Sequence, residues 1–115
     1  NIRMYGQVEN PYPYMKYADW FLCPSSRESF ALTLLEAITI GTPVITTACG
    51  GPDDVIDKGE YGIFVENSLD GVYNGMKRAI DAPELRSFYI SKKDRCLSRF
   101  DYQKWLGTVD NLLGI

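Results

Sequence analysis

A buried strand, a helix and a second buried strand follow one another between residues 19 and 48, and this order constrains the fold most. Residues 19–23 and 44–48 show no strict alternation of polar and apolar side chains, which is typical of strands covered on both faces of a parallel sheet. Between them, Ser29 is a natural N-cap for a helix over residues 30–40, and Gly41 and Pro43 end that helix. This order predicts an α/β fold with a parallel sheet.

Similar patterns continue on both sides of this unit. β-branched and aromatic residues predict further strands at residues 2–5 and 61–65. Prolines predict a short helix within residues 11–17 and a helix that runs from Pro83 to about residue 98. A helix with a buried face is predicted from apolar residues at helical spacing, namely Leu69, Val72, Tyr73, Met76 and Ile80. A helical tail follows, whose last helix carries Trp105, Val109, Leu112 and Leu113 on one side.

Composition excludes several classes of function. The chain has 115 residues, the size of one domain, and its net charge of -3 disfavours nucleic acid as a partner. It has no histidine, so mechanisms that use imidazole are excluded. Cys23, Cys49 and Cys96 include no close pair, so we expect reduced thiols in a cytoplasmic protein. No apolar stretch approaches the roughly 20 residues that span a bilayer. Because the chain begins with Asn1 rather than Met, we expect a piece of a longer protein.

One charge lies on the apolar helix predicted for residues 30–40. Thr33, Glu36 and Thr39 form a polar stripe on its surface. An unpaired carboxylate is costly to bury, so we expect Glu36 to face water, a cation or hydroxyl donors. Glu28 precedes the N-cap, and the helix rise would separate the two carboxylates by roughly 12 Å. The free amides at the helix start favour phosphate, so these features together suit a ligand with a diphosphate and sugar hydroxyls.

The residues from Glu28 to Ala37, followed by residues 41–45 and 50–52, resemble the retaining glycosyltransferases of the group 1 type. Residues upstream of them are similar to the approach to that family's paired-glutamate motif, so the resemblance covers residues 2 to 65. It implies an enzyme with two Rossmann-like domains, the GT-B arrangement. Residues 1–115 would form a single, partial C-terminal nucleotide-sugar-binding domain, a Rossmann-like three-layer α/β fragment with a helical C-terminal tail. Without the acceptor domain, this fragment alone would be inactive.

The resemblance also implies roles for individual residues. Glu28 would bind donor-sugar hydroxyls at the catalytic centre and Glu36 would bind ribose hydroxyls, and neither would be a covalent nucleophile. The sugar or diphosphate would meet the N-cap and the amides that follow it, at Ser29, Phe30, Ala31 and Leu32. The family usually has Gly where this chain has Ala31, which narrows the space beside the donor.

The reaction implied by the resemblance is transfer of a sugar from a nucleotide-sugar to an acceptor hydroxyl, with retention of configuration. It belongs to cytoplasmic glycan or polysaccharide biosynthesis and needs no metal and no cofactor. The partners implied are the nucleotide-sugar donor and an acceptor glycan or lipid-linked glycan, which the missing domain would hold. Peripheral membrane association of the full enzyme is also implied.

Two other functions stay open: a fragment of a nucleotide-sugar epimerase and a non-catalytic α/β binding module. Single residues also have plainer interpretations, in which Glu36 faces solvent, Tyr12 and Tyr14 pack a loop onto the core, and residues 50–52 form a turn. The basic residues of the tail would form a solvated helix face rather than a contact with acidic lipid or another domain; they are Lys92, Lys93, Arg95 and Arg99. A Glu36 side chain beneath packed apolar neighbours would contradict the sugar-transfer assignment.

Overall fold

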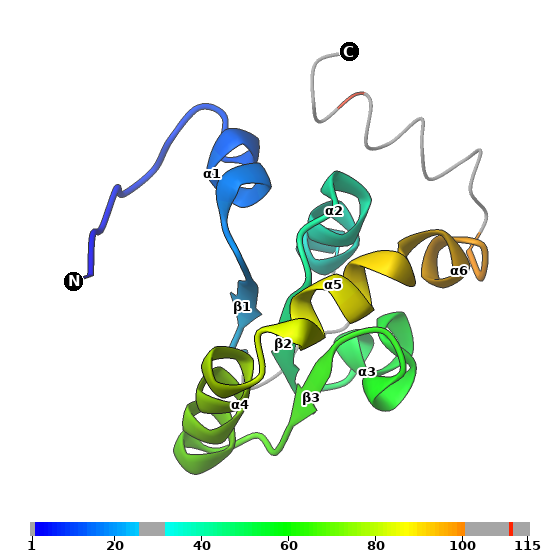
Figure 1. Cartoon of the computed structure of the whole chain (residues 1–115). Helices are drawn as coiled ribbons and strands as arrows, with labels where there is room; N and C mark the ends of the chain where they lie inside the picture. Colours follow the sequence, from blue (N-terminus) through cyan, green and yellow to red (C-terminus); the bar gives the residue numbers. More distant parts are fainter. Residues whose placement is uncertain (1, 26–31, 101–110, 112–115) are drawn as a thin grey trace.

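The structure, a computed structural model, describes residues 2–25, 32–100 and 111. Three strands, β1 (Phe21–Cys23), β2 (Val44–Thr47) and β3 (Ile63–Val65), pair in parallel in the order β1-β2-β3 (Figure 1). The helices are α1 (Tyr12–Tyr17), α2 (Leu32–Ile40), α3 (Gly51–Val55), the 3-10 helix η1 (Asp57–Gly59), α4 (Leu69–Asp81), α5 (Glu84–Ser91) and α6 (Lys93–Leu97). The parallel sheet of the predicted α/β fold is therefore confirmed.

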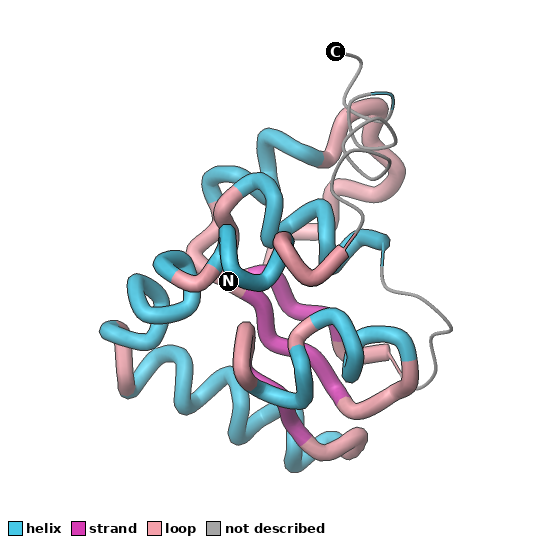
Figure 2. Tube along the Cα trace, turned by 90° about the vertical axis from the view of Figure 1, so that its right-hand side faces the viewer, coloured by secondary structure: helices cyan, strands magenta, loops and turns pink. Residues whose placement is uncertain are grey.

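Helices cover both faces of this sheet, so that the strands form the middle of three layers (Figure 2). On one face, α2 contacts β1 and β2, and Leu34 and Val44 share a large buried cluster. On the other face, α4 contacts β2 and β3, and Ile45, Ile63 and Ala79 share a smaller cluster. Val44 and Ile45 thus face opposite layers, because successive side chains of a strand point to opposite sides of the sheet.

The strand predicted at residues 2–5 is wrong. These residues form no ladder, and Ile2 and Met4 are 92% and 93% exposed. A strand needs a neighbour for its backbone hydrogen bonds, and in doubly wound sheets that neighbour need not be the next strand in sequence. None of the described segments pairs with residues 2–5, so their preference for extended backbone does not lead to a strand.

The end of α2 is closed by the predicted glycine. Gly41 has a φ of +99°, a conformation that favours glycine. Its N–H donates to the carbonyl of Ile38 at 3.0 Å, and the N–H of Thr42 donates to the carbonyl of Ala37 at 2.9 Å, which is a Schellman motif. The Thr42 hydroxyl also donates to the carbonyl of Met15 at 2.6 Å, and this buried bond ties α1 to the end of α2.

The large apolar residues predicted to form the buried face of α4 mostly point away from the sheet. Leu69, Tyr73 and Ile80 are 88%, 63% and 76% exposed, whereas the small residues Gly71, Gly75 and Ala79 are buried. The cause is the short distance between α4 and the sheet, since a Cβ atom on Gly75 would lie 2.6 Å from Val65 Cγ1. Of the predicted stripe, Val72 is half-buried and Met76 is 44% exposed.

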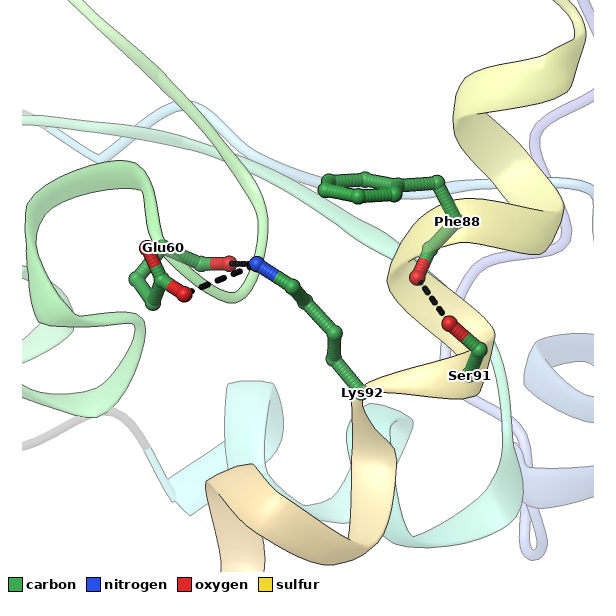
Figure 3. A network of polar contacts seen from close by, with 4 residues as sticks. All are labelled: Glu60, Phe88, Ser91 and Lys92. Atoms are coloured by element: carbon green, nitrogen blue, oxygen red, sulfur yellow. Dashed lines mark hydrogen bonds and ion pairs between the residues drawn. The ribbon is translucent and has the colours of Figure 1, made fainter.

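The helix predicted to run to residue 98 is divided into α5 and α6 at Lys92, which also fastens these helices to the rest of the fold (Figure 3). Lys92 Nζ donates to the Glu60 carbonyl at 3.1 Å and pairs with Glu60 Oε1 at 2.8 Å, while it lies 4.5 Å from the centre of the Phe88 ring. Arg99 donates to the carbonyls of Asp54 and Val55 at the end of α3, at 2.7 and 3.0 Å. The solvated face predicted for the basic residues is therefore wrong for Lys92, whose charge is paired with Glu60, whereas Arg99 is exposed while it donates to α3.

Candidate functional site

The candidate site lies at the carboxyl edge of the sheet, where the chain leaves β1 toward α2. Of the predicted site residues, Glu28, Ser29, Phe30 and Ala31 lie outside the described residues. Leu32 begins α2 and is half-buried, and Glu36 lies one turn further along the same helix. The described structure therefore tests the environment of Glu36 and leaves the predicted N-cap and the role of Glu28 as predictions.

Two threonines at the end of β2 fix the chain as it leaves β1. The hydroxyl of Thr46 donates to the carbonyl of Cys23 at 3.3 Å, and that of Thr47 donates to the carbonyl of Ser25 at 2.5 Å. Both threonines are buried, at 0% and 1% exposed. Sequence analysis missed them, although a polar residue in an otherwise buried strand is the signal that could have found them.

Residues 50–52 do more than form the predicted turn, because they begin α3. Gly50 has a φ of +110°, and its N–H and that of Cys49 donate to Asp53 Oδ1 at 3.3 and 3.0 Å. The Asp53 carboxylate thus satisfies two amides at the same sheet edge.

The polar stripe of α2 divides into three different environments. Thr33 is exposed, and the Thr39 hydroxyl donates back to the carbonyl of Leu35 at 2.8 Å. Glu36 is only 6% exposed, so the interpretation of Glu36 as a solvent-facing residue is wrong. Among the described residues, the hydroxyl of Tyr12 acts on the pKa of this carboxyl as a hydrogen-bond donor. A hydroxyl donor is one of the three environments expected for Glu36, so the carboxylate is buried but does not face apolar neighbours alone.

Burial sets the electrostatics of this pair. It raises the pKa of the Glu36 carboxyl above its ordinary value, because the charged form loses its hydration, and the hydrogen bond from Tyr12 opposes part of that rise. The pKa of the Tyr12 hydroxyl is raised by burial and by the charge and hydrogen bond of Glu36. Tyr12 therefore keeps its proton and acts as a donor to the carboxylate.

Tyr12 packs against the large buried cluster, as predicted for an aromatic residue beside prolines. It also lines an open pocket of about 490 Å³ between α1 and the end of α2, together with Lys16, Thr39 and Ile40. Tyr14 is 51% exposed, and its ring centre lies 4.8 Å from that of Tyr5. The prediction that both tyrosines pack onto the core thus holds for Tyr12 and is wrong for Tyr14.

Within residues 2–25, 32–100 and 111, no three His, Cys, Asp or Glu side chains gather where they could hold a metal ion. In the same part of the chain, every helix is too short or too polar to cross a membrane. Cys23, Cys49 and Cys96 are all buried.

Comparison with known proteins gives a consistent result. The family model described as "Glycosyl transferases group 1" matches residues 1–94. The chain is 37% identical over 116 residues to D-inositol 3-phosphate glycosyltransferase 1 of Catenulispora acidiphila, a match that covers 95% of this chain and 27% of that protein. It is 44% identical over 51 residues to 2-deoxystreptamine N-acetyl-D-glucosaminyltransferase of Niallia circulans, covering 44% of this chain and 13% of that protein.

A solved structure shows the same fold. Sucrose-phosphate synthase from Thermosynechococcus elongatus matches with a TM-score of 0.70 and 26% sequence identity, over 89% of this chain and 26% of that chain. This similarity confirms the predicted Rossmann-like α/β fold. The chain spans about a quarter or less of the proteins that it matches.

Proposed function

Because this chain belongs to the group 1 glycosyl transferases, we propose that it forms part of the nucleotide-sugar site of an enzyme that transfers a sugar to an acceptor hydroxyl. The observation that carries the proposal is the Glu36 side chain, which is only 6% exposed although it lies on α2, the helix that follows β1. Burial of a carboxylate lowers stability unless it is well paired, so a residue of this kind at a sheet edge marks a binding role.

The matched relatives support a role on the donor side. The name of the Catenulispora protein specifies D-inositol 3-phosphate, whereas that of the Niallia protein specifies 2-deoxystreptamine. These two molecules differ in their charged groups, a phosphate in one and amines in the other, and both proteins have this segment in common, which favours a contribution that does not depend on the acceptor. The same names favour a transferase over an epimerase fragment or a non-catalytic binding module.

In this proposal the two glutamates bind hydroxyls and the helix start binds phosphate. Glu36 accepts hydrogen bonds from the ribose, and Glu28 accepts them from the donor sugar at the catalytic centre. The backbone amides from Ser29 to Leu32 stabilise the charge that the diphosphate gains as the glycosidic bond breaks. Retention of configuration follows from a front-face reaction, in which the donor phosphate assists the incoming hydroxyl and no glutamate forms a covalent bond.

The wider setting is part of the same proposal. The acceptor, a glycan or lipid-linked glycan, is held by a part of the enzyme that this chain does not contain, and the chain alone is inactive. The reaction serves glycan or polysaccharide biosynthesis in the cytoplasm, with peripheral association of the full enzyme with the membrane. It needs no metal and no cofactor besides the nucleotide-sugar.

Saturation-transfer NMR of the chain with UDP-, GDP- and ADP-sugars tests the proposal. At least one nucleotide-sugar should show enhancement on its ribose protons, and Glu36→Gln should abolish it. Glu60→Gln is the matched control, because Glu60 is bonded to Lys92 and is not part of the proposed site. This variant should leave the enhancement unchanged. No enhancement with any donor, from a sample whose spectrum shows a folded chain, contradicts the proposal.

A further inference from the structure

An apolar groove of about 180 Å³ lies between β1 and α4, on the face of the sheet opposite α2. Its two most buried lining residues are Ile45 and Ala79, at 2% and 6% exposed. The other four come from the chain at β1 and from α4, and all six are apolar; they are Trp20, Leu22, Met76 and Ile80. An apolar cavity of roughly 150 Å³ can hold a benzene molecule, so this groove has room for a large apolar side chain from a partner.

Large apolar side chains extend the groove along the surface of α4. Met76 and Ile80 are 44% and 76% exposed, and Leu69 and Tyr73 are 88% and 63% exposed. The four residues follow one another at intervals of three or four, so they form one stripe on the helix. Because α4 meets β2 and β3 through its small residues, this stripe lies beside the sheet and is not covered by it. A continuous exposed apolar surface of this kind marks an interaction site.

The sheet also ends at β1 with backbone groups that face outward. Phe21 pairs with Val44 of β2, and its N–H donates to the carbonyl of Pro43 at 2.9 Å. In a parallel strand, successive residues direct their N–H and C=O groups to opposite sides, so those of Leu22 point away from β2. None of the described segments pairs on that side. Such an edge is a template for another strand, and at Leu22 it adjoins the groove.

Neither residues 2–5 nor a second copy of the chain would complete this region. Residues 2–5 lead into α1, which contacts α2 on the opposite face, so they bring no helix to the groove. A two-fold axis that placed β1 against its copy would make an antiparallel pair at the centre of two parallel sheets. Each α4 would remain over its own β2 and β3, and the groove side of both β1 strands would stay uncovered.

A strand together with its connecting helix would meet both needs, since parallel strands are joined by helices and are covered on both faces. The chain spans 27% of the Catenulispora protein, so a relative of this kind contains ample further chain to supply such a unit. We propose that a strand from the rest of the longer enzyme adds in parallel to the open edge of β1, and that its helix packs into the groove against Trp20, Met76 and Ile80. This inference rests on the part of the proposed function that makes this chain a piece of a longer enzyme.

The test compares the 115-residue chain with a full-length chimera, in which this chain replaces the matching segment of the Catenulispora protein. Both carry Ile80→Cys, and mass spectrometry of the peptide measures its rate of labelling by a maleimide. Cys23, Cys49 and Cys96 are buried, so the introduced thiol is the exposed one among the cysteines of this chain. Labelling should be about tenfold slower or more in the chimera, because the added helix would cover residue 80.

Arg78→Cys is the matched control on the same helix. Arg78 is exposed and lies about 200° around the helix from both Met76 and Ile80, away from the groove. Its labelling rate should be the same in the chain and in the chimera. Equal rates for Ile80→Cys in the two proteins, with the chimera folded, overturn the proposal.

Hydrogen exchange tests the added strand. In the isolated chain the amide of Leu22 should exchange quickly and that of Cys23, which points to β2, slowly, whereas in the chimera both should be slow. Protection of the Leu22 amide in the isolated monomer would mean that the edge is already filled, and this result overturns the proposal even if the chimera does not fold. Labelling of Ile80→Cys that slows as the concentration of the isolated chain rises would identify a second copy as the occupant, which also overturns it.

These measurements are separate from the test of the nucleotide-sugar site. No nucleotide is present in them, so a folded chain that binds no nucleotide contradicts the role of Glu36 and leaves this inference in place. Unprotected Ile80→Cys in the chimera overturns the docking of the strand and helix alone.

Discussion

Glu36 is the residue at which stability and binding oppose one another. Burial raises the pKa of its carboxyl, so the folded chain holds this proton more tightly than the unfolded chain does. The contribution of Glu36 to stability is therefore fully present below its unfolded pKa and is lost as the pH rises through the folded pKa. At neutral pH the ionised carboxylate makes the fold less stable than a neutral side chain of the same shape would.

We predict that Glu36→Gln raises the thermal midpoint of the chain at pH 7 while it abolishes nucleotide binding. The amide can still accept the hydroxyl of Tyr12, and it carries no charge that needs hydration. The advantage of the variant should shrink as the pH is lowered toward 4.5, the ordinary value for the carboxyl, where the natural residue also becomes neutral. Calorimetric scans between pH 4 and pH 8 measure this, and a lower midpoint for the variant at pH 7 would contradict it.

Cys96 should be the least reactive thiol of the described chain. Burial raises the pKa of the Cys96 thiol to about 11, and the side chain is 1% exposed. At pH 8 only about one thiol in a thousand would then be ionised, and the thiolate is the reactive form. A disulfide reagent should modify Cys96 at the rate of unfolding, as read by mass spectrometry of the peptides. Modification of Cys96 at the rate of a free thiol peptide would show the prediction to be wrong.

Among the elements, α4 shows best what the sequence predicts and what it does not. The spacing of large apolar residues correctly predicts a helix, but the face that meets the sheet carries Gly71, Gly75 and Ala79. These residues also repeat at helical spacing, and their small size allows the backbone to approach the strands. Which of two faces is buried depends on the distance between layers, and that distance is a tertiary property.

We predict that Gly75→Ala destabilises the chain by about 1–3 kcal/mol, because the new methyl group would press against Val65 and Ile45. The direction of this change in the free energy of unfolding is informative, because alanine in place of glycine at an exposed helix position normally stabilises a protein by about 1 kcal/mol. Urea unfolding measures the difference. Tyr73→Ala, at a position 63% exposed, is the comparison on the same helix and should change stability by less than about 0.5 kcal/mol. If Tyr73→Ala destabilised the chain more than Gly75→Ala does, the large apolar residues would form the buried face of α4, as their spacing predicts.

The end of β1 at Cys23, the end of α2 at Ile40 and the start of β2 at Val44 could be predicted because their signals are local. Gly41 has the left-handed conformation that closes a helix, and this requirement is visible in one residue. The partner of Glu36 could not be predicted in the same way, because Tyr12 comes from another helix and meets it only through tertiary packing. The break at Lys92 has a similar cause, since its charge is held by Glu60 from outside the helix.

At the scale of the whole molecule, a few polar contacts join helices and loops that are far apart in the sequence. Thr42 joins α1 to α2. Lys92 joins the α5–α6 segment to the chain before β3, and Arg99 joins the end of the same segment to α3. The C-terminal end of the helix that carries Glu36 is thus tied to α1, which suits a site that must keep a buried carboxylate in place.

The pH dependence of stability should therefore be a sum of opposite effects from Glu36 and Glu60. The hydrogen bond and charge of Lys92 lower the pKa of the Glu60 carboxyl. The contribution of Glu60 to the stability of the fold is therefore present above its unfolded pKa of 4.5 and is lost as the pH falls through the folded pKa. We predict that Lys92→Met is less stable than the unmodified chain at pH 7, and that this difference narrows below pH 4.5. The contact of Lys92 with the Phe88 ring involves no carboxyl group, so a part of the difference should persist at low pH.

Lys77→Met is the appropriate control for this prediction. Lys77 pairs with Asp81 one turn away on α4, at 3.5 Å, with both side chains more than half exposed. Solvent screens such a pair, so its removal should leave the denaturation midpoint nearly unchanged at every pH. Urea midpoints measured from pH 3 to pH 8 for the three proteins decide the question. If the urea midpoints of Lys92→Met and the unmodified chain differ by a constant amount across this pH range, the prediction is wrong. Apolar contacts of Lys92 would then hold α5 and α6 in place, and the ion pair with Glu60 would contribute nothing to stability.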